Sequence, residues 1–314
     1  MDEYLQAREQ TLIHDLELLK DDVLKIDRII TFLIEVRATL SDRVEFWIKN
    51  TLPQCREIGY DRGLFSLLVH FAYYYLMKSD FAMGKSYLEK ASQIDWSCFL
   101  HSREHMYFYH AHGVFYYYTS DRDLAMEYFD KALELARSLK DRDFTCQMLN
   151  NLASYYTKGG EYKIAEAYLL EAFSLIDPEK NPFPALKIMD NLASLYIARE
   201  NYDRARDYLD TAFSYGVDRK IDYMIPSLHY NYGLICEKEG KLDEAEEFYK
   251  KAYDGNGDKN FQEDIALGYP RFLFDRKRWE EGQVLTDEII KLFQQKGMVR
   301  SLDKVYHLMD EYDI

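Results

Sequence analysis

Four columns of small and apolar residues recur along this chain at a nearly constant spacing, and this period constrains the fold more than any other feature. Successive members of each column lie 41, 40, 40 and 40 residues apart. The first column holds Ala72, Gly113, Ala153, Ala193 and Gly233, and the other three begin at Gly84, Leu88 and Ala91. Self-similarity at a fixed period of roughly 20 to 50 residues is typical of repeat arrays. The sequence therefore predicts a stack of equivalent units.

Each unit is predicted to be an antiparallel pair of helices. Its small and large residues lie three, four or seven positions apart, which places them on one face of a helix. Small residues let two helices approach closely, and large residues fill the space beside them. Turn-forming residues fall between the two apolar stripes, at Gly159-Gly160, Glu200-Asn201 and Gly240-Lys241. The segments DPEKNPFP and DGNGDKN are predicted to link successive units.

The run NLAxxY followed by Ala-x-x-x-Leu-x-x-Ala, at residues 151–172 and 191–212, resembles the signature of tetratricopeptide repeats. This resemblance implies an all-α fold, a right-handed superhelical array of helix pairs (an α-solenoid), with five units over residues 64–258. A degenerate repeat is expected at 259–300, where Pro270 and Thr286 occupy signature columns. The period exceeds the commonest one of about 34 residues. In this it is similar to bacterial peptide receptors of the Rap and PlcR kind, and to helical sensor regions that precede cyclic-nucleotide-making domains.

The two ends of the chain differ from the five units. Residues 2–50 contain neither Gly nor Pro, and their apolar residues, among them Val23 and Ile30, follow a three–four spacing. This pattern is typical of a coiled coil, which would make residues 5–40 a homodimer seam. The same spacing also fits a degenerate first repeat with a capping helix. In that case residues 1–63 would fold onto the array. Residues 301–314 are predicted to form a C-terminal capping helix, unless a further domain follows Ile314.

Composition excludes several classes of partner. The net charge is −15, with 55 acidic against 40 basic residues, which argues against direct binding to nucleic acid. Cys55, Cys98, Cys146 and Cys236 form no CxxC pattern and are predicted to be reduced core thiols. The N-terminus lacks a signal peptide, and the longest apolar run, at residues 64–77, is too short to span a bilayer. We therefore expect a cytoplasmic protein without a membrane partner.

Two motifs imitate metal sites. The run from His101 through Glu104 to His105 matches the H-x-x-E-H spelling of one class of zinc proteases, but it falls where a repeat begins. Asp254–Asp258 imitates the start of a calcium loop, but Lys259 and Ile265 stand where Gly and Glu belong. No nucleophile, base and oxyanion donor can be placed together. The sequence predicts no catalytic residue, no metal and no cofactor.

One polar column is the best candidate for ligand contact. Asn151, Asn191 and Asn231 recur just before the small residue of the first helix. In proteins that this chain resembles, first helices line a concave groove, where an asparagine amide can both donate to and accept from a peptide backbone. The alternative is that these asparagines brace neighbouring helices. The same face in earlier units carries aromatic and imidazole side chains that are either ligand anchors or core, namely His70, Tyr73, Tyr107, His110, Tyr117 and Tyr118.

We interpret the sequence as a non-enzymatic module that binds a peptide or a partner segment in its groove, as a bacterial cytoplasmic sensor or adaptor does. Two alternatives stay open. The chain is either the regulatory half of a signalling enzyme, such as a diguanylate cyclase, or of a transcription regulator, or else a scaffold that dimerises through its N-terminal helix.

Overall fold

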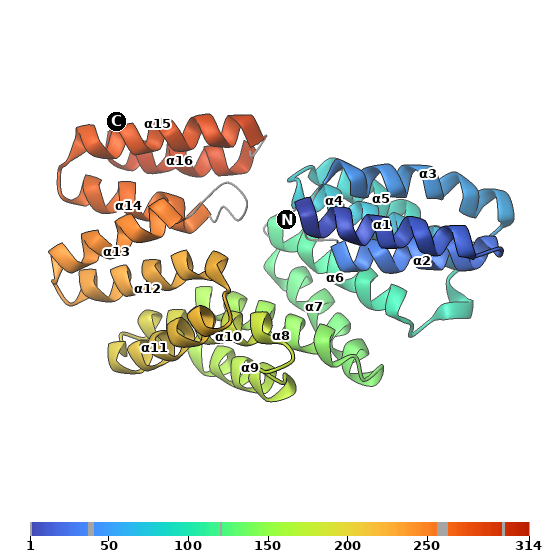
Figure 1. Ribbon diagram of the computed structural model, residues 1–314, viewed down its shortest axis with the longest axis horizontal. Coiled ribbons are helices and arrows are strands. Elements are labelled where there is room, and N and C mark those ends of the chain that lie inside the picture. The colour runs from blue at the N-terminus through green and yellow to red at the C-terminus, as the bar shows by residue number, and fades with distance from the viewer. Residues whose placement is uncertain (1, 37–40, 120, 256–262, 297–298, 314) are drawn as a thin grey trace. The chain divides into compact units, whose positions relative to one another are not determined.

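The fold is built from helices. The computed structural model describes residues 2–36, 41–119, 121–255, 263–296 and 299–313. Over these ranges, every regular element is an α-helix or a short 3-10 turn (Figure 1). The predicted all-α fold class is confirmed, because adjacent helices pack as pairs along the chain. The chain forms two compact units, Met1–Asp141 and Arg142–Ile314, which are described separately.

The first unit contains three N-terminal helices followed by two helix pairs. Helix α4 packs against α5, and α6 packs against α7. The first helix of one pair, α4, also contacts the first helix of the other, α6. The elements are α1 (Asp2–Leu18), α2 (Asp22–Val36), α3 (Asp42–Ile58), α4 (Asp61–Met77), α5 (Phe81–Ser92), the 3-10 turn η1 (Ser97–Phe99), α6 (Arg103–Tyr118) and α7 (Arg122–Ser138).

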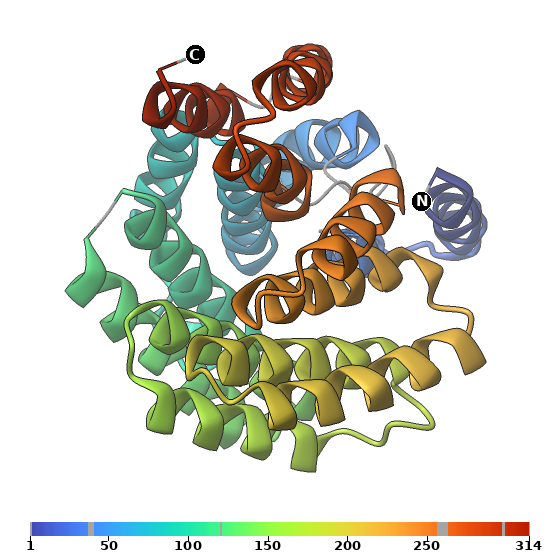
Figure 2. The same cartoon turned by 90° about the vertical axis from the view of Figure 1, so that its left-hand side faces the viewer.

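The second unit stacks four helix pairs and ends on α16. The stack can be followed in Figure 2 from green to red. First helices α8, α10, α12 and α14 contact one another in sequence, and α16 packs on α14 and α15. The elements are α8 (Arg142–Lys158), α9 (Tyr162–Leu175), α10 (Pro182–Ala198), α11 (Tyr202–Asp218), η2 (Asp222–Met224), α12 (Ile225–Lys238), α13 (Leu242–Gly255), α14 (Glu263–Asp275), α15 (Trp279–Lys296) and α16 (Val299–Glu311).

Turns within the pairs lie where the sequence predicts them. Gly160, Glu200 and Gly240 end first helices in the left-handed conformation, with φ of 79°, 57° and 77°. This conformation is routine only for glycine, and it reverses the chain within a few residues. The predicted linker DPEKNPFP is wrong at its second half, because α10 already begins at Pro182. Proline fits the first helical turn, where its missing N–H would have no partner in the helix.

The small-residue column lies between the two helices of each pair. Ala72, Ala153 and Ala193 have no exposed surface. At Gly113 an added Cβ would lie 2.4 Å from the Phe129 ring, and at Gly233 it would lie 2.9 Å from the Tyr249 ring. Large rings of the second helices thus fill the space that the small residues leave, which explains the 40-residue period.

Many of the 28 tyrosines bind carboxylates across helices. Tyr74 and Tyr75 on α4 both donate to Glu45 on α3, at 3.1 and 3.2 Å. Equivalent bonds in the second unit join Tyr196 to Glu166, Tyr249 to Glu237, Tyr253 to Glu288 and Tyr269 to Glu246. A tyrosine ring can pack in the core while its hydroxyl reaches a polar partner, which suits a stack with much surface relative to core.

Helix α1 folds back onto its neighbours. Leu5 and Leu12 are buried. Glu9, only 8% exposed, accepts hydrogen bonds from Arg43 Nη2 and Trp47 Nε1 of α3, each at 2.6 Å. Apolar packing and one charged anchor therefore hold α1 within the first unit. The homodimer seam at residues 5–40 stays a prediction, and residues 37–40 lie outside the described ranges.

We expect Glu9→Ala to loosen α1, because it removes the acceptor that Arg43 and Trp47 share and leaves the half-buried Trp47 without its bond to α1. Amide hydrogen exchange over residues 5–18 should become faster while α4 to α7 stay protected. Glu17→Ala, an exposed change on the same helix, is the matched control and should leave exchange unchanged. Equal protection in both variants would show that Glu9 does not anchor α1.

Candidate functional site

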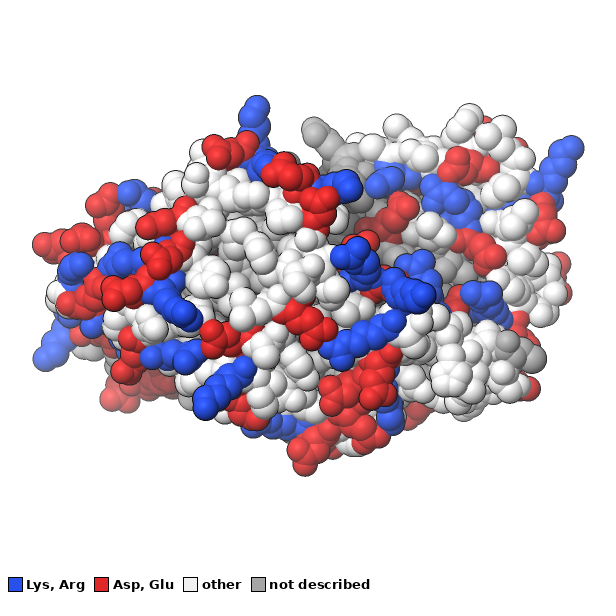
Figure 3. Space-filling model, turned by 90° about the horizontal axis from the view of Figure 1, so that it is seen from below, with Lys and Arg blue, Asp and Glu red and all other residues white. Residues whose placement is uncertain are grey.

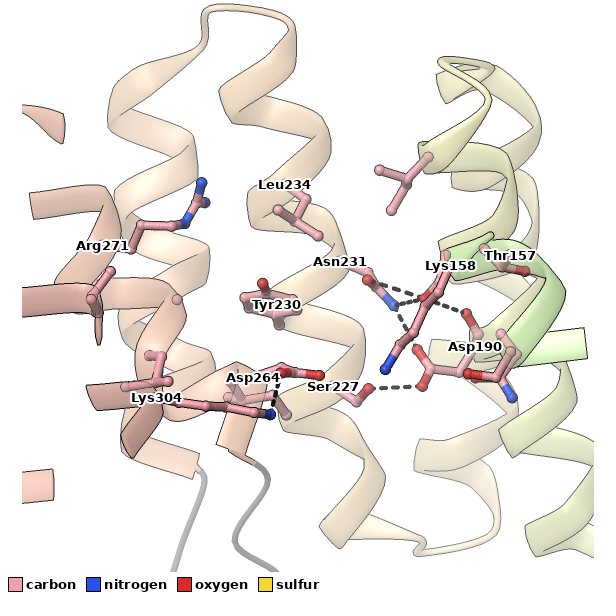
Figure 4. A pocket seen from close by; sticks show the side chains of 18 of the residues that line it. Thr157, Lys158, Asp190, Ser227, Tyr230, Asn231, Leu234, Asp264, Arg271 and Lys304 are labelled. Carbon is pink, nitrogen blue, oxygen red and sulfur yellow. Dashed lines mark hydrogen bonds and ion pairs between the residues drawn. The ribbon is translucent and has the colours of Figure 1, made fainter. Parts of the chain in front are cut away.

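A pocket of about 660 Å³ lies in the second unit, and we call it the main pocket. Its wall comes from the first helices α8, α10, α12 and α14 and from α16. Figure 4 shows Asp190, Ser227 and Asn231 together on one side, with Arg271 and Lys304 on the other. Four first helices and α16 thus present polar and charged side chains to one space.

Asp190 on α10 is the most buried charged group in this wall, with 2% of its surface exposed. Its carboxylate accepts hydrogen bonds from Ser227 Oγ and Asn231 Nδ2, each at 2.7 Å. The Lys187 ammonium lies 3.8 Å away. Burial raises the pKa of Asp190, and Lys187 and the two hydrogen bonds oppose that rise. Sequence reasoning missed this residue.

The asparagine column forms bridges between successive first helices. Asn191 Nδ2 donates to Asn150 Oδ1 at 2.7 Å, and Asn231 Nδ2 donates to Asp190 Oδ1 at 2.7 Å. Both bonds join residues 41 positions apart. We call this pair of bonds the amide ladder. It shows that Asn191 and Asn231 brace neighbouring helices, whichever ligand the pocket accepts.

The three predicted asparagines differ in exposure and place. Asn231 is 4% exposed and also contacts Ser194 Oγ at 3.1 Å, so its amide is committed to the wall. Asn191 is half-buried at the main pocket, and Asn151 is exposed. Asn151 lines a second pocket, of about 410 Å³, on α8 and α10. The structure therefore brings Asn191 and Asn231 to the main pocket. Asn151 does not line the main pocket, but it lies on α8, the helix that contributes Ser154 to that pocket.

Basic side chains of the main pocket have different partners. Arg271 Nη2 lies 3.0 Å from Glu237 Oε2 and 3.3 Å from the Tyr249 hydroxyl. Lys304 Nζ lies 4.0 Å from Asp264. Lys158 on α8 makes no ion pair with any residue of the described ranges. It is therefore the cation of this wall that is best placed to meet an acidic or polar group of a ligand.

The six candidate residues of the first unit lie on α4 and α6. His70, Tyr107 and His110 are buried, whereas Tyr73, Tyr117 and Tyr118 are half-buried. Ring centroids lie 5.3 Å apart between His70 and Tyr107, and 5.4 Å apart between Tyr73 and His110. These four rings thus pack across the two helices. Their role as ligand anchors stays a prediction.

Residues of the motifs that resemble metal sites make other contacts in the structure. His101 lies before α6 with φ of 61°, and Glu104 binds Arg62 at 2.9 Å. His105 is buried, with Nδ1 3.2 Å from the Phe99 carbonyl oxygen. Among the residues that the structure describes, no three His, Cys, Asp or Glu side chains cluster as a metal ion requires. Residues 256–262 of the calcium-like loop lie outside the described ranges.

Cys55, Cys146 and Cys236 are buried and free. The side chain of Cys98 lies outside the part of the chain that is described. No described helix is long and apolar enough to cross a membrane. On the face drawn in Figure 3, basic and acidic side chains are interspersed.

Stacked helix pairs with a small-residue column and a pocket on their first helices define a helical repeat protein. Two family models described as tetratricopeptide repeat match the sequence, at residues 106–176 and 191–260. The chain therefore contains tetratricopeptide repeats over these two segments. No protein of curated function matches its sequence.

Solved structures share the fold at low sequence identity. A Rap protein complexed with competence and sporulation factor is 15% identical, with a TM-score of 0.64 over 92% of this chain and 87% of that chain. NprR in complex with its cognate peptide NprX is 15% identical, with a TM-score of 0.66 over 91% and 84%. A signal transduction ATPase from Pyrococcus horikoshii with a tetratricopeptide repeat sensor is 16% identical, with a TM-score of 0.61 over 92% and 44%.

Proposed function

We propose that this protein is a non-enzymatic, cytoplasmic binding module that takes up a peptide, or an extended segment of a partner protein, in the main pocket. The observation that carries the proposal is the composition of the pocket wall. Five helices contribute amides, hydroxyls and charges of both signs to one space of about 660 Å³. This volume is typical of ligand sites, which measure roughly 300 to 1,000 Å³.

An extended peptide fits this wall better than an apolar ligand does. Its backbone presents unpaired N–H and C=O groups, and these need partners that donate and accept. Asn151 is exposed. Asn191 is half-buried and uses one amide N–H to brace Asn150, which leaves its Oδ1 and second N–H for a ligand, so we assign backbone contact to both residues. We assign Asn231 to bracing, because its amide is buried against Asp190. Lys158 would meet an acidic or polar group of the peptide.

The structural relatives support the same class of ligand. The Rap and NprR structures are complexes of those proteins with a signalling factor or a cognate peptide. This chain shares their fold, although identity of 15% carries no residue-level correspondence. We therefore propose a sensor or adaptor role. The alternative of a sensing segment within a larger signalling protein is favoured by the Pyrococcus ATPase, in which a repeat sensor belongs to a longer chain.

The test starts from a library of random linear peptides selected on the full-length protein. We expect the double variant Asn151→Ala/Asn191→Ala to bind the selected peptides at least tenfold more weakly, because two hydrogen bonds of about 0.7 kcal/mol or more each contribute about 1.4 kcal/mol or more. Isothermal titration calorimetry gives the dissociation constants. Asn50→Ala, an exposed asparagine on α3, is the control and should bind as the wild type does. Failure to select any binding peptide, or equal affinity of both variants, would contradict the proposal.

A further inference from the structure

The second pocket differs in character from the main one. It has a volume of about 410 Å³ and lies between the N-terminal halves of α8 and α10, beside the segment that links α9 to α10. We call it the side pocket. Lys187 lines both pockets, so the two spaces adjoin along α10. A chain that runs along the first helices of this unit would therefore pass the mouth of the side pocket.

The interior of the side pocket is largely apolar. Its apolar lining consists of Cys146, Ile176, Phe183, Pro184 and Ile188. Burial raises the pKa of the Cys146 thiol to about 11, with Asp143 adding to the effect. The thiol is therefore neutral at physiological pH and acts as a small apolar group rather than as a nucleophile. These five side chains offer an apolar surface to a hydrocarbon side chain.

Polar side chains also line the side pocket, at Asp143, Gln147, Asn150, Asn151, Asn181 and Lys187. Asn151, which is exposed, and Lys187, which is half-buried, both line the side pocket. Asn150 also lines it, but its Oδ1 already accepts the bond from Asn191. In a pocket with both kinds of lining, apolar contacts with a ligand side chain can supply affinity while polar groups hold the ligand's main chain.

We propose that the side pocket is a specificity subsite that binds one aliphatic or aromatic side chain of the peptide. The main chain of the peptide would lie at Asn151 and Asn191. This inference rests on the proposed function and adds to it the chemical class of the residue that the protein selects. The occupant follows from continuity. Lys187 lines both the side pocket and the main pocket, and the exposed Asn151 lines the side pocket.

The subsite is tested with peptides selected from the random linear library on the full-length protein. We expect the selected peptides to share one aliphatic or aromatic position. Changing that position to Ala should weaken binding to the wild type by tenfold to a hundredfold, as expected for losing one buried apolar side chain of about 1.5 to 3 kcal/mol.

Two variants then locate the effect. Ile176→Trp narrows the side pocket from its linker wall, so on this variant the same peptide change should weaken binding less than it does on the wild type. Cys146→Ala enlarges the floor with little risk to folding, and it should shift selection toward larger apolar residues. Ile164→Trp places the same ring at an exposed position outside both pockets and should behave as the wild type does. Melting temperatures confirm that each variant is folded.

The outcomes separate the two proposals. If no peptide binds, the proposed function fails. If peptides bind but share no apolar position, or if the apolar-to-Ala change weakens binding equally on wild type and Ile176→Trp, the subsite is wrong while the peptide-binding function stands. The subsite is supported if Cys146→Ala selects peptides with larger apolar side chains and if the apolar-to-Ala change in the peptide weakens binding less on Ile176→Trp than on the wild type.

Discussion

Replacing Asn231 by Leu should destabilise the second unit by about 3 kcal/mol near neutral pH. The amide of Asn231 donates to Asp190 Oδ1 at 2.7 Å, and the carboxylate is almost wholly buried. A leucine has similar size but no donor, so it leaves a buried charge with one hydrogen bond fewer. Hydrogen exchange of α10 and α12 and urea unfolding of the full chain measure the loss.

The destabilisation by Asn231→Leu should depend on pH. Burial already raises the pKa of Asp190 above its ordinary value of 3.8, and loss of a donor raises it further. Ionisation is then penalised in the folded state only, so stability falls as the pH rises above the unfolded-state pKa. We expect the loss to be largest near pH 7 and to shrink toward about pH 4.

Two controls isolate the charge. Asn151→Leu changes an exposed member of the same column and should alter stability by less than about 0.5 kcal/mol. Asp190→Asn removes the charge, so adding Asn231→Leu to it should give a loss that hardly varies with pH. A loss that is independent of pH in the single variant would show that the Asp190 carboxylate is not what Asn231 stabilises.

Replacing Gly113 by Leu should destabilise the first unit by about 2 to 3 kcal/mol. Even a Cβ at this position would lie 2.4 Å from the ring of Phe129, and that ring is itself 7% exposed and packed near His110. The side chain must push α6 away from α7, because the ring has little room to move. Thermal unfolding and hydrogen exchange of α6 and α7 give the measurement.

The matched control for Gly113→Leu is Ala167→Leu. It adds a comparable side chain at an exposed position within helix α9. Because leucine and alanine both favour helices, this change should shift stability by less than about 0.5 kcal/mol. Equal stability of the Gly113→Leu variant and the wild type would contradict the view that the small-residue column sets the distance between paired helices.

The helix pairs were predictable because the same packing solution repeats. Ala153 and Ala193 stand in a column that recurs every 40 residues, and a buried small residue at a helix crossing cannot be replaced freely. The left-handed turns at Gly160 and Gly240 repeat with it. A single repeat would have been hard to recognise, whereas five aligned copies distinguish packing positions from exposed ones.

The wall of the pocket was only partly predictable. The asparagine column found Asn191 and Asn231 but not their partners, Asn150 and Asp190. Those partners lie 41 residues back, so one residue of stagger between neighbouring first helices moves each contact off the 40-residue column. No periodic signal marks position 190, since the equivalent residues are Asn150 and Tyr230. Charged residues are also rarely buried, so nothing in the composition pointed to Asp190 as a core group.

The amide ladder has a consequence for the thermodynamics of binding. Apolar contacts allow helices to slide and tilt at little energetic cost, whereas a hydrogen bond holds its two atoms at one distance and direction. Bonds of 2.7 Å from Asn191 to Asn150 and from Asn231 to Asp190 fix α8, α10 and α12 relative to one another before any ligand arrives. Binding of a peptide to this wall therefore requires little ordering of the protein, so that more of the interaction free energy remains as affinity.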